Sequence, residues 1–224
     1  RNFNDIMTDG SFSNLWIVNF DGTDAPPLTT GNQNHFAPRW SPEGTKLLYA
    51  SARDGGVELW LRWMDTGPTA QLTNLTDSPY AVHWSPDGQW IAFTMYVPEA
   101  PESFVSRPPK PEGAEWAAPA KVITRTDYRA DGAGYTEDGY QQIFVLAADG
   151  GTPRQITWGP YHQGGTIAWS PGGESLIFSA NRHENREWEP ANSEIYEVSL
   201  ADGEITALTD RHGPDLRPVL SPDA

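Results

Sequence analysis

The 224-residue sequence contains no cysteine, which excludes disulfide bonds, thiol catalysis and cysteine-ligated zinc or iron–sulfur sites. It also has few basic residues, since 15 Lys and Arg stand against 30 Asp and Glu and the formal net charge is −15. A surface of this sign repels nucleic-acid phosphates and anionic lipids, so we expect neither nucleic acid nor a membrane as a partner. No apolar run approaches the roughly 20 residues that a membrane span needs.

The motifs of several catalytic and metal sites are missing as well. No serine has glycine at both −2 and +2, as a nucleophile elbow requires. The five histidines never stand at His-x-x-x-His spacing, and the Asp-rich turns are typical of turn formers rather than of a calcium loop. We therefore expect no catalytic triad, no metal and no cofactor in this chain.

The sequence does not begin with Met. Its first residue is Arg1, and we expect that the original start is lacking. Any signal peptide would lie upstream, so the sequence leaves the compartment open between a bacterial cytoplasm and a periplasm. With 38% hydrophobic residues and 20% charged residues, the chain is expected to form a packed core.

An internal repeat dominates what is present. Three markers keep a nearly fixed register across four copies, and such repetition predicts a recurring structural unit. The first marker is Trp-Ser-Pro, with Leu replacing Trp in the last copy, at 40–42, 84–86, 169–171 and 220–222. The second is a Leu-Thr or Ile-Thr pair at 28–29, 72–73, 156–157 and 208–209. The third, 13 residues before that pair, lies at 15–16, 59–60, 143–144 and 195–196.

Short strands separated by tight turns are predicted throughout. Runs of about five β-branched and aromatic residues occur at 15–19, 46–50, 90–94, 142–146, 175–179 and 195–199. Ser-Pro-Asp-Gly and Asp-Gly turns stand between them. Four strands in about 44 residues, repeated, indicate an all-β fold built from β-propeller blades.

The register predicts an incomplete propeller of three whole blades and two partial ones. The whole blades are expected at 35–73, 80–157 and 166–209, and the partial ones at 15–29 and 216–224. A propeller removes its open sheet edges by closing a ring, which this chain cannot do alone. We expect the natural polypeptide to be longer at both ends, with completion by a second fragment as the alternative.

Two insertions mark one face of the disc. The tryptophan marker precedes the third-strand marker by 19 residues in the first whole blade, 59 in the second and 26 in the third, so the later blades carry 40 and 7 extra residues between the second and third strands. The larger insertion covers 96–139, and strand parity places both on the same face, where binding residues gather. The candidate substrate-facing residues are Arg125, Arg129, Asp131, Tyr135, Arg182, Glu184, Glu187 and Glu189. Arginine recognises carboxylates and glutamate can hold an amine, but solvated loop charges or contacts to a neighbouring domain are the alternative.

Longer motifs carry a family resemblance over essentially the whole chain. Besides the repeats, they are Tyr-Arg-Ala-Asp-Gly-Ala-Gly-Tyr at 128–135, Gly-Gly-Thr-Pro-Arg-Gln-Ile-Thr at 150–157 and Ser-Ala-Asn-Arg-His at 179–183. With them the chain resembles the N-terminal propeller of prolyl-oligopeptidase-family serine peptidases, of the acylaminoacyl-peptidase and dipeptidyl-peptidase-like branch. The resemblance implies a seven- or eight-bladed propeller over a C-terminal α/β-hydrolase domain that carries the catalytic Ser, Asp and His. It also implies short peptide substrates, which the propeller gates and selects.

One departure from that family and one rival function stay open. Dipeptidyl peptidases of the family hold the substrate amino terminus with an adjacent Glu-Glu pair, which this sequence lacks, and Glu187 and Glu189 are a poor substitute. This favours acylaminoacyl-peptidase or oligopeptidase-like specificity. The rival is a non-enzymatic, Tol-system-like propeller that serves as a protein-interaction platform, while a small lectin-like propeller is disfavoured by the broken blades. A homo-oligomer is a further open alternative.

Overall fold

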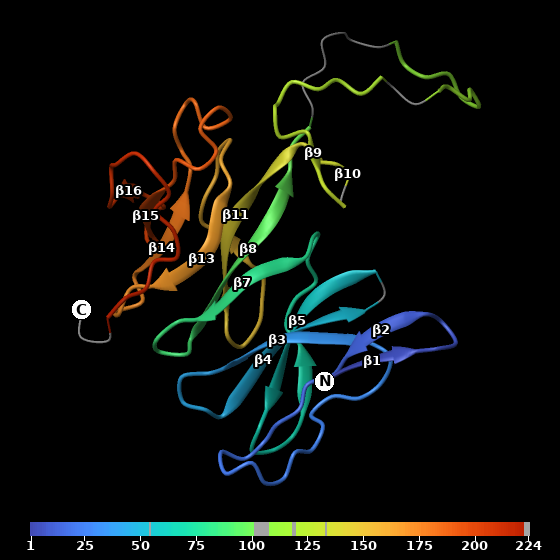
Figure 1. Cartoon of the computed structure of the whole chain (residues 1–224), viewed down its shortest axis with the longest axis vertical. Helices are drawn as coiled ribbons and strands as arrows, with labels where there is room; N and C mark the ends of the chain where they lie inside the picture. Colours follow the sequence, from blue (N-terminus) through green and yellow to red (C-terminus); the bar gives the residue numbers. More distant parts are fainter. Residues whose placement is uncertain (54, 101–107, 118–119, 133, 222–224) are drawn as a thin grey trace.

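The chain is an all-β protein. The computed structural model describes residues 1–53, 55–100, 108–117, 120–132 and 134–221, and within these ranges it has sixteen strands and no helix. Three four-stranded antiparallel units follow one another along the chain and lie beside each other like blades (Figure 1). The predicted propeller fold is confirmed, and the described residues form no closed ring.

The first unit carries an extra hairpin at its inner edge. Its four strands are β3 (Asn34–Trp40), β4 (Lys46–Arg53), β5 (Gly56–Trp63) and β6 (Thr69–Gln71). The hairpin consists of β1 (Asn2–Asp5) and β2 (Gly10–Ser13). Because Ser13 pairs in parallel with Asn34, the hairpin and the unit form one six-stranded sheet.

The other two units are single four-stranded sheets. The second comprises β7 (Pro79–Trp84), β8 (Trp90–Pro98), β11 (Gly139–Ala147) and β12 (Arg154–Gln155). Between β8 and β11 lies a separate small hairpin of β9 (Arg129–Ala130) and β10 (Gly134–Tyr135). The third unit comprises β13 (Gln163–Trp169), β14 (Ser175–Ala180), β15 (Glu194–Ser199) and β16 (Ile205–Ala207).

The repeated tryptophans join neighbouring units. The first strands β3, β7 and β13 contact one another in turn, which places them innermost. The indole N–H of Trp84 donates to the carbonyl of Arg39 at 3.2 Å, and that of Trp169 donates to the carbonyl of His83 at 3.3 Å. Each acceptor immediately precedes the tryptophan of the unit before, so the same bond recurs from blade to blade.

Apolar side chains fill the spaces between the sheets. Phe93 and Phe144, directly paired across β8 and β11, stack with ring centroids 5.6 Å apart in the core between the first two units. Their strand neighbours Ala92 and Val145 belong instead to the core between the second and third units. Alternate residues of one strand thus face opposite neighbours, as the two-residue period of a strand buried on both sides requires.

The Leu-Thr markers owe their register to a repeated side-chain bond. The hydroxyl of Thr157 accepts the N–H of Ile143 and donates to the side chain of Gln142, at 2.9 and 2.8 Å. The equivalent threonines make the same two bonds with the first residue of their own third marker and the residue before it. These sets are Thr29 with Leu15 and Asn14, Thr73 with Leu59 and Glu58, and Thr209 with Ile195 and Glu194. The 13-residue spacing therefore fixes the outer edge of each unit.

The strand predictions hold except at the start of the chain. The five runs from 46–50 onward lie in β4, β8, β11, β14 and β15, but residues 15–19 are not a strand. They form an isolated bridge from Trp16 to Pro27 and single backbone hydrogen bonds such as that from Ile17 to Pro26. They form no strand ladder, because Pro26 and Pro27 have no N–H to donate. The β1–β2 hairpin was not predicted.

The end of the chain repeats a backbone feature of the inner strands. Ala37 and Ala81 lie three residues before their tryptophans with φ of 51° and 47°, next to a β-bulge in each strand. Arg217, three residues before Leu220, has φ of 57°. Residues 216–221 of the last predicted partial blade, 216–224, form no strand, and residues 222–224 lie outside the described part of the chain.

Candidate functional site

Three connecting segments converge at one end of the second and third units. They are the insertion between β8 and β11, the link at 158–162 between β12 and β13, and the insertion at 181–190 between β14 and β15. Figure 1 shows both insertions at the same end of the sheets, opposite the tight turns. The backbone N–H of Thr126 donates to the carboxylate of Glu187 at 3.1 Å, so the two insertions are in direct contact.

The guanidinium group of Arg125 is held in a fixed orientation. It makes a bidentate ion pair with Asp127, with Nε 2.9 Å from Oδ1, and lies over the ring of Tyr140 at 4.8 Å from the centroid. This hydrogen-bonded pairing lowers the pKa of Asp127, which stays ionised. Tyr140 is itself buried in β11, so the insertion is anchored to the sheet.

Two adjoining pockets share these residues. The larger, called the insertion pocket below, has a volume of about 530 Å³ and lies between the two insertions and the link. Its lining comprises Arg125, Thr126, Asp127, Tyr140, His162, Asn181, Arg186, Glu187 and Pro190. The smaller, about 270 Å³, shares Arg125, Asp127 and His162 and adds Tyr96 and the start of β11. The volume of the insertion pocket is in the range of small-ligand sites.

His162 is a neutral donor between the two pockets. Its Nδ1 accepts the backbone N–H of Gln141 at 3.1 Å, so the proton of the neutral ring lies on Nε2. Burial, followed by the positive charge of Arg125, lowers the pKa of His162 below its ordinary value. At neutral pH the imidazole therefore offers one N–H to a ligand.

Two further arginines flank an aromatic ring of the link. The guanidinium carbons of Arg182 and Arg186 lie 4.7 and 4.9 Å from the centroid of the Tyr161 ring, and Arg182 also lies 5.6 Å from that of Tyr196. These cation–π contacts hold both guanidinium groups, and neither group has an ion pair with a carboxylate of the described residues.

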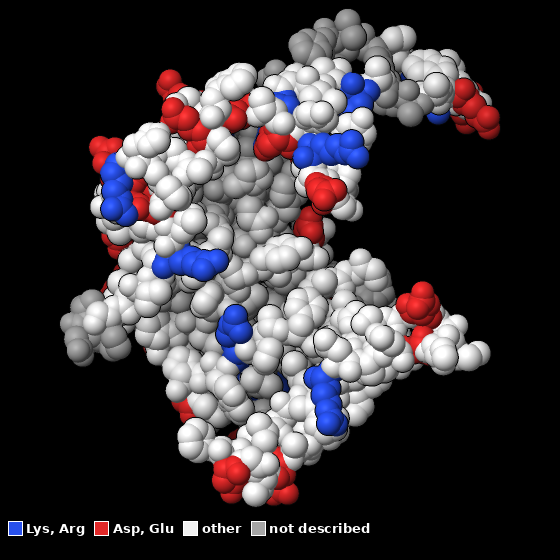
Figure 2. Space-filling view, in the orientation of Figure 1, with Lys and Arg blue, Asp and Glu red and all other residues white. Residues whose placement is uncertain are grey.

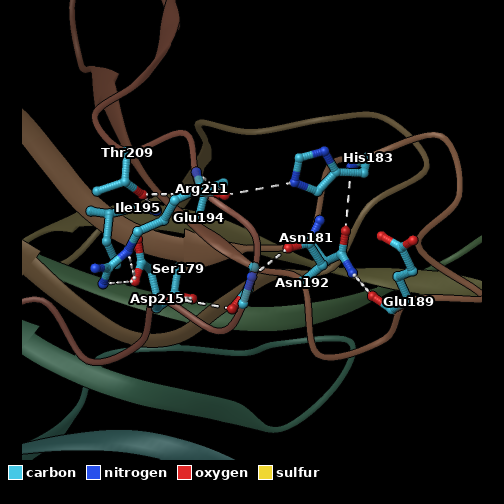
Figure 3. A network of polar contacts seen from close by, with 12 residues as sticks. Ser179, Asn181, His183, Glu189, Asn192, Glu194, Ile195, Thr209, Arg211 and Asp215 are labelled. Atoms are coloured by element: carbon cyan, nitrogen blue, oxygen red, sulfur yellow. Dashed lines mark hydrogen bonds and ion pairs between the residues drawn. The ribbon is translucent and has the colours of Figure 1, made fainter.

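A polar network holds the second insertion (Figure 3). The carboxylate of Glu194, at the start of β15, is 2% exposed and accepts from the hydroxyl of Thr209 and, at 3.0 Å, from the backbone N–H of Arg211. The side chain of Asn181 donates to the carbonyl of Glu189 at 2.7 Å and closes the loop on itself. The loop that carries Arg182 and Arg186 is therefore held to the third unit by hydrogen bonds.

The predicted site residues separate into two groups. Arg125 and Glu187 line the insertion pocket, and Arg182 lies beside it. Glu189 contributes its carbonyl to the loop, and Glu184 is exposed. The remaining three belong to the β9–β10 hairpin and its turn, where they are exposed, namely Arg129, Asp131 and Tyr135. The ring of Tyr135 is covered by Lys121 at 4.2 Å.

Seven of the nine residues that line the insertion pocket were not among the predicted site residues. Asp127 and Arg186 belong to the two insertions, two and four residues from predicted arginines, but nothing in the pattern distinguishes them from solvated charges. His162 lies in the link that strand parity places on this same face, which was the available signal. Tyr140 reads as the start of a core strand, and its role as a platform for Arg125 needs the fold.

The described residues offer few other kinds of site. Within them no group of three His, Cys, Asp or Glu side chains is placed to hold a metal ion. Nor do they include a helix with the length and apolarity needed to cross a membrane. On the face seen in Figure 2, acidic side chains gather at the periphery, and several Lys and Arg side chains lie nearer the middle.

Comparison with known proteins identifies relatives of the chain. Uncharacterized peptidase YuxL of Bacillus subtilis (strain 168) is 33% identical over 180 residues, which are 77% of this chain and 26% of that protein. Dipeptidyl-peptidase 5 of Porphyromonas endodontalis is 25% identical over 229 residues, covering 97% of this chain and 32% of that protein. The chain thus spans about a third or less of the length of these curated relatives.

Solved structures and a family model agree on the fold. The acylaminoacyl peptidase of Pyrococcus horikoshii superposes with a TM-score of 0.68 at 15% identity, covering 94% of this chain and 30% of that one. A family model described as TolB beta propeller domain matches residues 6–184. Since this match runs from the first hairpin into the third unit, and the units have propeller geometry, the chain belongs to the TolB beta propeller domain family.

Proposed function

We propose that this chain is the propeller portion of a serine peptidase that hydrolyses short peptides, and that its insertion face contacts and selects the substrate. One observation carries the proposal, namely that the two insertions meet and enclose a pocket on a single face. The similarity to YuxL and to dipeptidyl-peptidase 5, both named as peptidases, supports it. The reaction itself would take place in an α/β-hydrolase domain through an acyl-enzyme.

The role proposed for the propeller is selection rather than bond breaking. The described residues carry charged and aromatic side chains around a pocket, but no serine among them lies in a nucleophile elbow. Without an adjacent Glu-Glu pair, we expect acylaminoacyl-peptidase or oligopeptidase-like specificity rather than release of dipeptides.

Fluorophosphonate labelling of the protein isolated from its natural source tests the proposal. The reagent reacts with activated serines, and labelled protein is read on a denaturing gel and by intact mass. We expect a labelled species far above the 24.7 kDa of this chain. An unlabelled species at 24.7 kDa would overturn the proposal, because no catalytic domain would then be attached.

A protein-interaction platform is the second candidate. The family model that matches the chain is that of the TolB beta propeller domain, and the open faces of a propeller suit protein contacts. The same labelling experiment separates the two functions, since a platform without a hydrolase domain takes up no label.

A further inference from the structure

Two arginines at the insertion pocket lack an acidic partner within the described part of the chain. The arginines that do form an ion pair with a carboxylate there are Arg125 and Arg211. Among the described residues, however, neither Arg182 nor Arg186 forms an ion pair, although both lie against Tyr161. Two like charges beside one ring repel each other, and an anion between them would relieve that repulsion.

Hydrogen-bond donors are in excess at this place. The Nη1 group of Arg182 is buried and has no hydrogen-bond partner in the described part of the chain. Arg186 lines the insertion pocket, and His162 adds the N–H of its Nε2. A buried charged donor without an acceptor is costly, and an acceptor supplied by a ligand would remove that cost.

The acidic residues of the pocket are already engaged. Asp127 is held by Arg125 in a bidentate pair, and Glu187 accepts the backbone N–H of Thr126. Both carboxylates thus already accept hydrogen bonds, and neither is ion-paired with Arg182 or Arg186 among the described residues. Within the lining, the guanidinium group of Arg186 and the ring N–H of His162 are the donors that face no carboxylate in an ion pair.

We propose that the insertion pocket binds a carboxylate group of a peptide through Arg186 and Arg182, with His162 as an additional donor. This inference rests on the proposed function, which supplies the peptide, and it names the substrate chemistry. A planar guanidinium group pairs with both oxygens of a carboxylate, and Tyr161 holds two such groups in place beforehand. The carboxylate comes from one of two sources, the free C-terminus or an Asp or Glu side chain.

Binding of three acetylated tripeptides to the intact protein tests the inference. The peptides are Ac-Ala-Ala-Ala with a free carboxylate, its C-terminal amide, and Ac-Ala-Glu-Ala amide, which carries only a side-chain carboxylate. Titration calorimetry is performed in chloride buffer after fluorophosphonate treatment, so that no peptide is cleaved. We expect a carboxylate peptide to bind at least about tenfold more tightly than the neutral amide, as charge-assisted hydrogen bonds imply.

Variants assign the preference to the pocket. Arg186→Gln and Arg182→Gln should each reduce the difference between acid and amide to about twofold or less. Arg39→Gln removes the same charge from an exposed position on β3 in the first unit and should leave the difference unchanged. If only the first peptide is preferred over the amide, the pocket recognises a free C-terminus. If both carboxylate-containing peptides are preferred, the pocket recognises carboxylates in general.

Two results would overturn the inference. One is that the wild-type protein binds all three peptides with equal affinity. This measurement does not depend on the folding of any variant. The other is a carboxylate preference that survives both pocket substitutions. Either result leaves the labelling experiment unaffected, and a failure of labelling leaves the peptide comparison intact, so the two proposals fail separately.

Discussion

A single threonine fixes the outer edge of each blade. In all four copies a threonine hydroxyl accepts the backbone N–H of the first residue of the third repeat marker and donates to the side chain of the residue before it. The hydroxyl can do both because it is at once a donor and an acceptor. The Leu-Thr marker, which the sequence pattern predicts as part of a strand, therefore stabilises the edge of the sheet through side-chain hydrogen bonds.

Removing one of these hydroxyls should cost stability where it is buried. In Thr157→Val the shape is kept, but the N–H of Ile143 and the amide oxygen of Gln142 lose their partner. Thr157 is completely buried, so water cannot replace the bond, and we expect the free energy of unfolding to fall by about 1–3 kcal/mol. Urea denaturation measures it. Thr29→Val, at a half-exposed copy, is the matched control, and an equal loss in both variants would contradict the explanation.

Two histidines with a lowered pKa predict a loss of stability in weak acid. Burial is the main cause that lowers the pKa of His83 and of His162 below the ordinary 6.5. The unfolded chain takes up protons near that value while the folded chain stays neutral to lower pH. The free energy of unfolding therefore falls as the pH drops below about 6.5. The carboxylates of Asp87 and Asp127, whose pKa values are lowered from 3.8, add a loss only in stronger acid.

A substitution isolates the histidine effect. We expect the urea midpoint to fall between about pH 7.5 and pH 5.5, and to fall less in His83→Gln, which has no group to protonate. The quantity compared is the change in the urea midpoint between the two pH values. A loss of stability that the substitution causes equally at both pH values therefore cancels. An identical fall in both proteins would show that burial of His83 is not linked to protonation.

At the scale of strands and loops, the sequence correctly predicted the strands that recur from blade to blade. Five of the six strand runs were located correctly because blade strands have a fixed period and defined turns. The hairpin of β1 and β2 occurs once, with no second copy to compare, and residues 15–19 read as a strand because the effect of the opposing prolines depends on pairing.

The candidate site was predictable only in its location. Strand parity placed both insertions on one face, and Thr126 and Glu187 are in contact there. Which charges face the pocket depends on stacking between segments distant in sequence, such as Arg186 on Tyr161, and no local pattern encodes such a contact. For the same reason Arg129 and Asp131 were chosen by residue type, although they lie in an exposed hairpin.

The return of the large insertion into the sheet should be sensitive to a single methyl group. Gly139 begins β11 with φ of 150°, and a β-carbon there would lie 2.4 Å from the carbonyl oxygen of Val97 in β8. Gly139→Ala must therefore displace backbone, and we expect it to lower the free energy of unfolding by about 1–3 kcal/mol. Gly56, at the start of β5, has open space and no positive φ, so Gly56→Ala should change it by less than about 0.5 kcal/mol. Equal effects in urea denaturation would contradict this role of Gly139.

At the scale of the whole molecule, charge acts at two ranges. The net charge of −15 attracts cations from a distance, while the arginines of the insertion pocket attract an anion at contact. A short peptide that carries positive side chains and a free carboxylate satisfies both. The long-range part should be visible in kinetics and the short-range part in affinity, because only the former depends on diffusion through the surrounding field.

Salt dependence of kcat/KM tests the long-range part. Screening shortens the electrostatic range from about 10 Å at 0.1 M salt to about 3 Å at 1 M, so steering of a dicationic peptide should weaken. With the intact protein we expect its kcat/KM to fall several-fold over roughly this range, whereas that of an uncharged peptide of equal length stays within about twofold. The uncharged peptide controls for effects of salt on the reaction itself. If both substrates respond alike, the acidic surface serves solubility alone and takes no part in capturing the substrate.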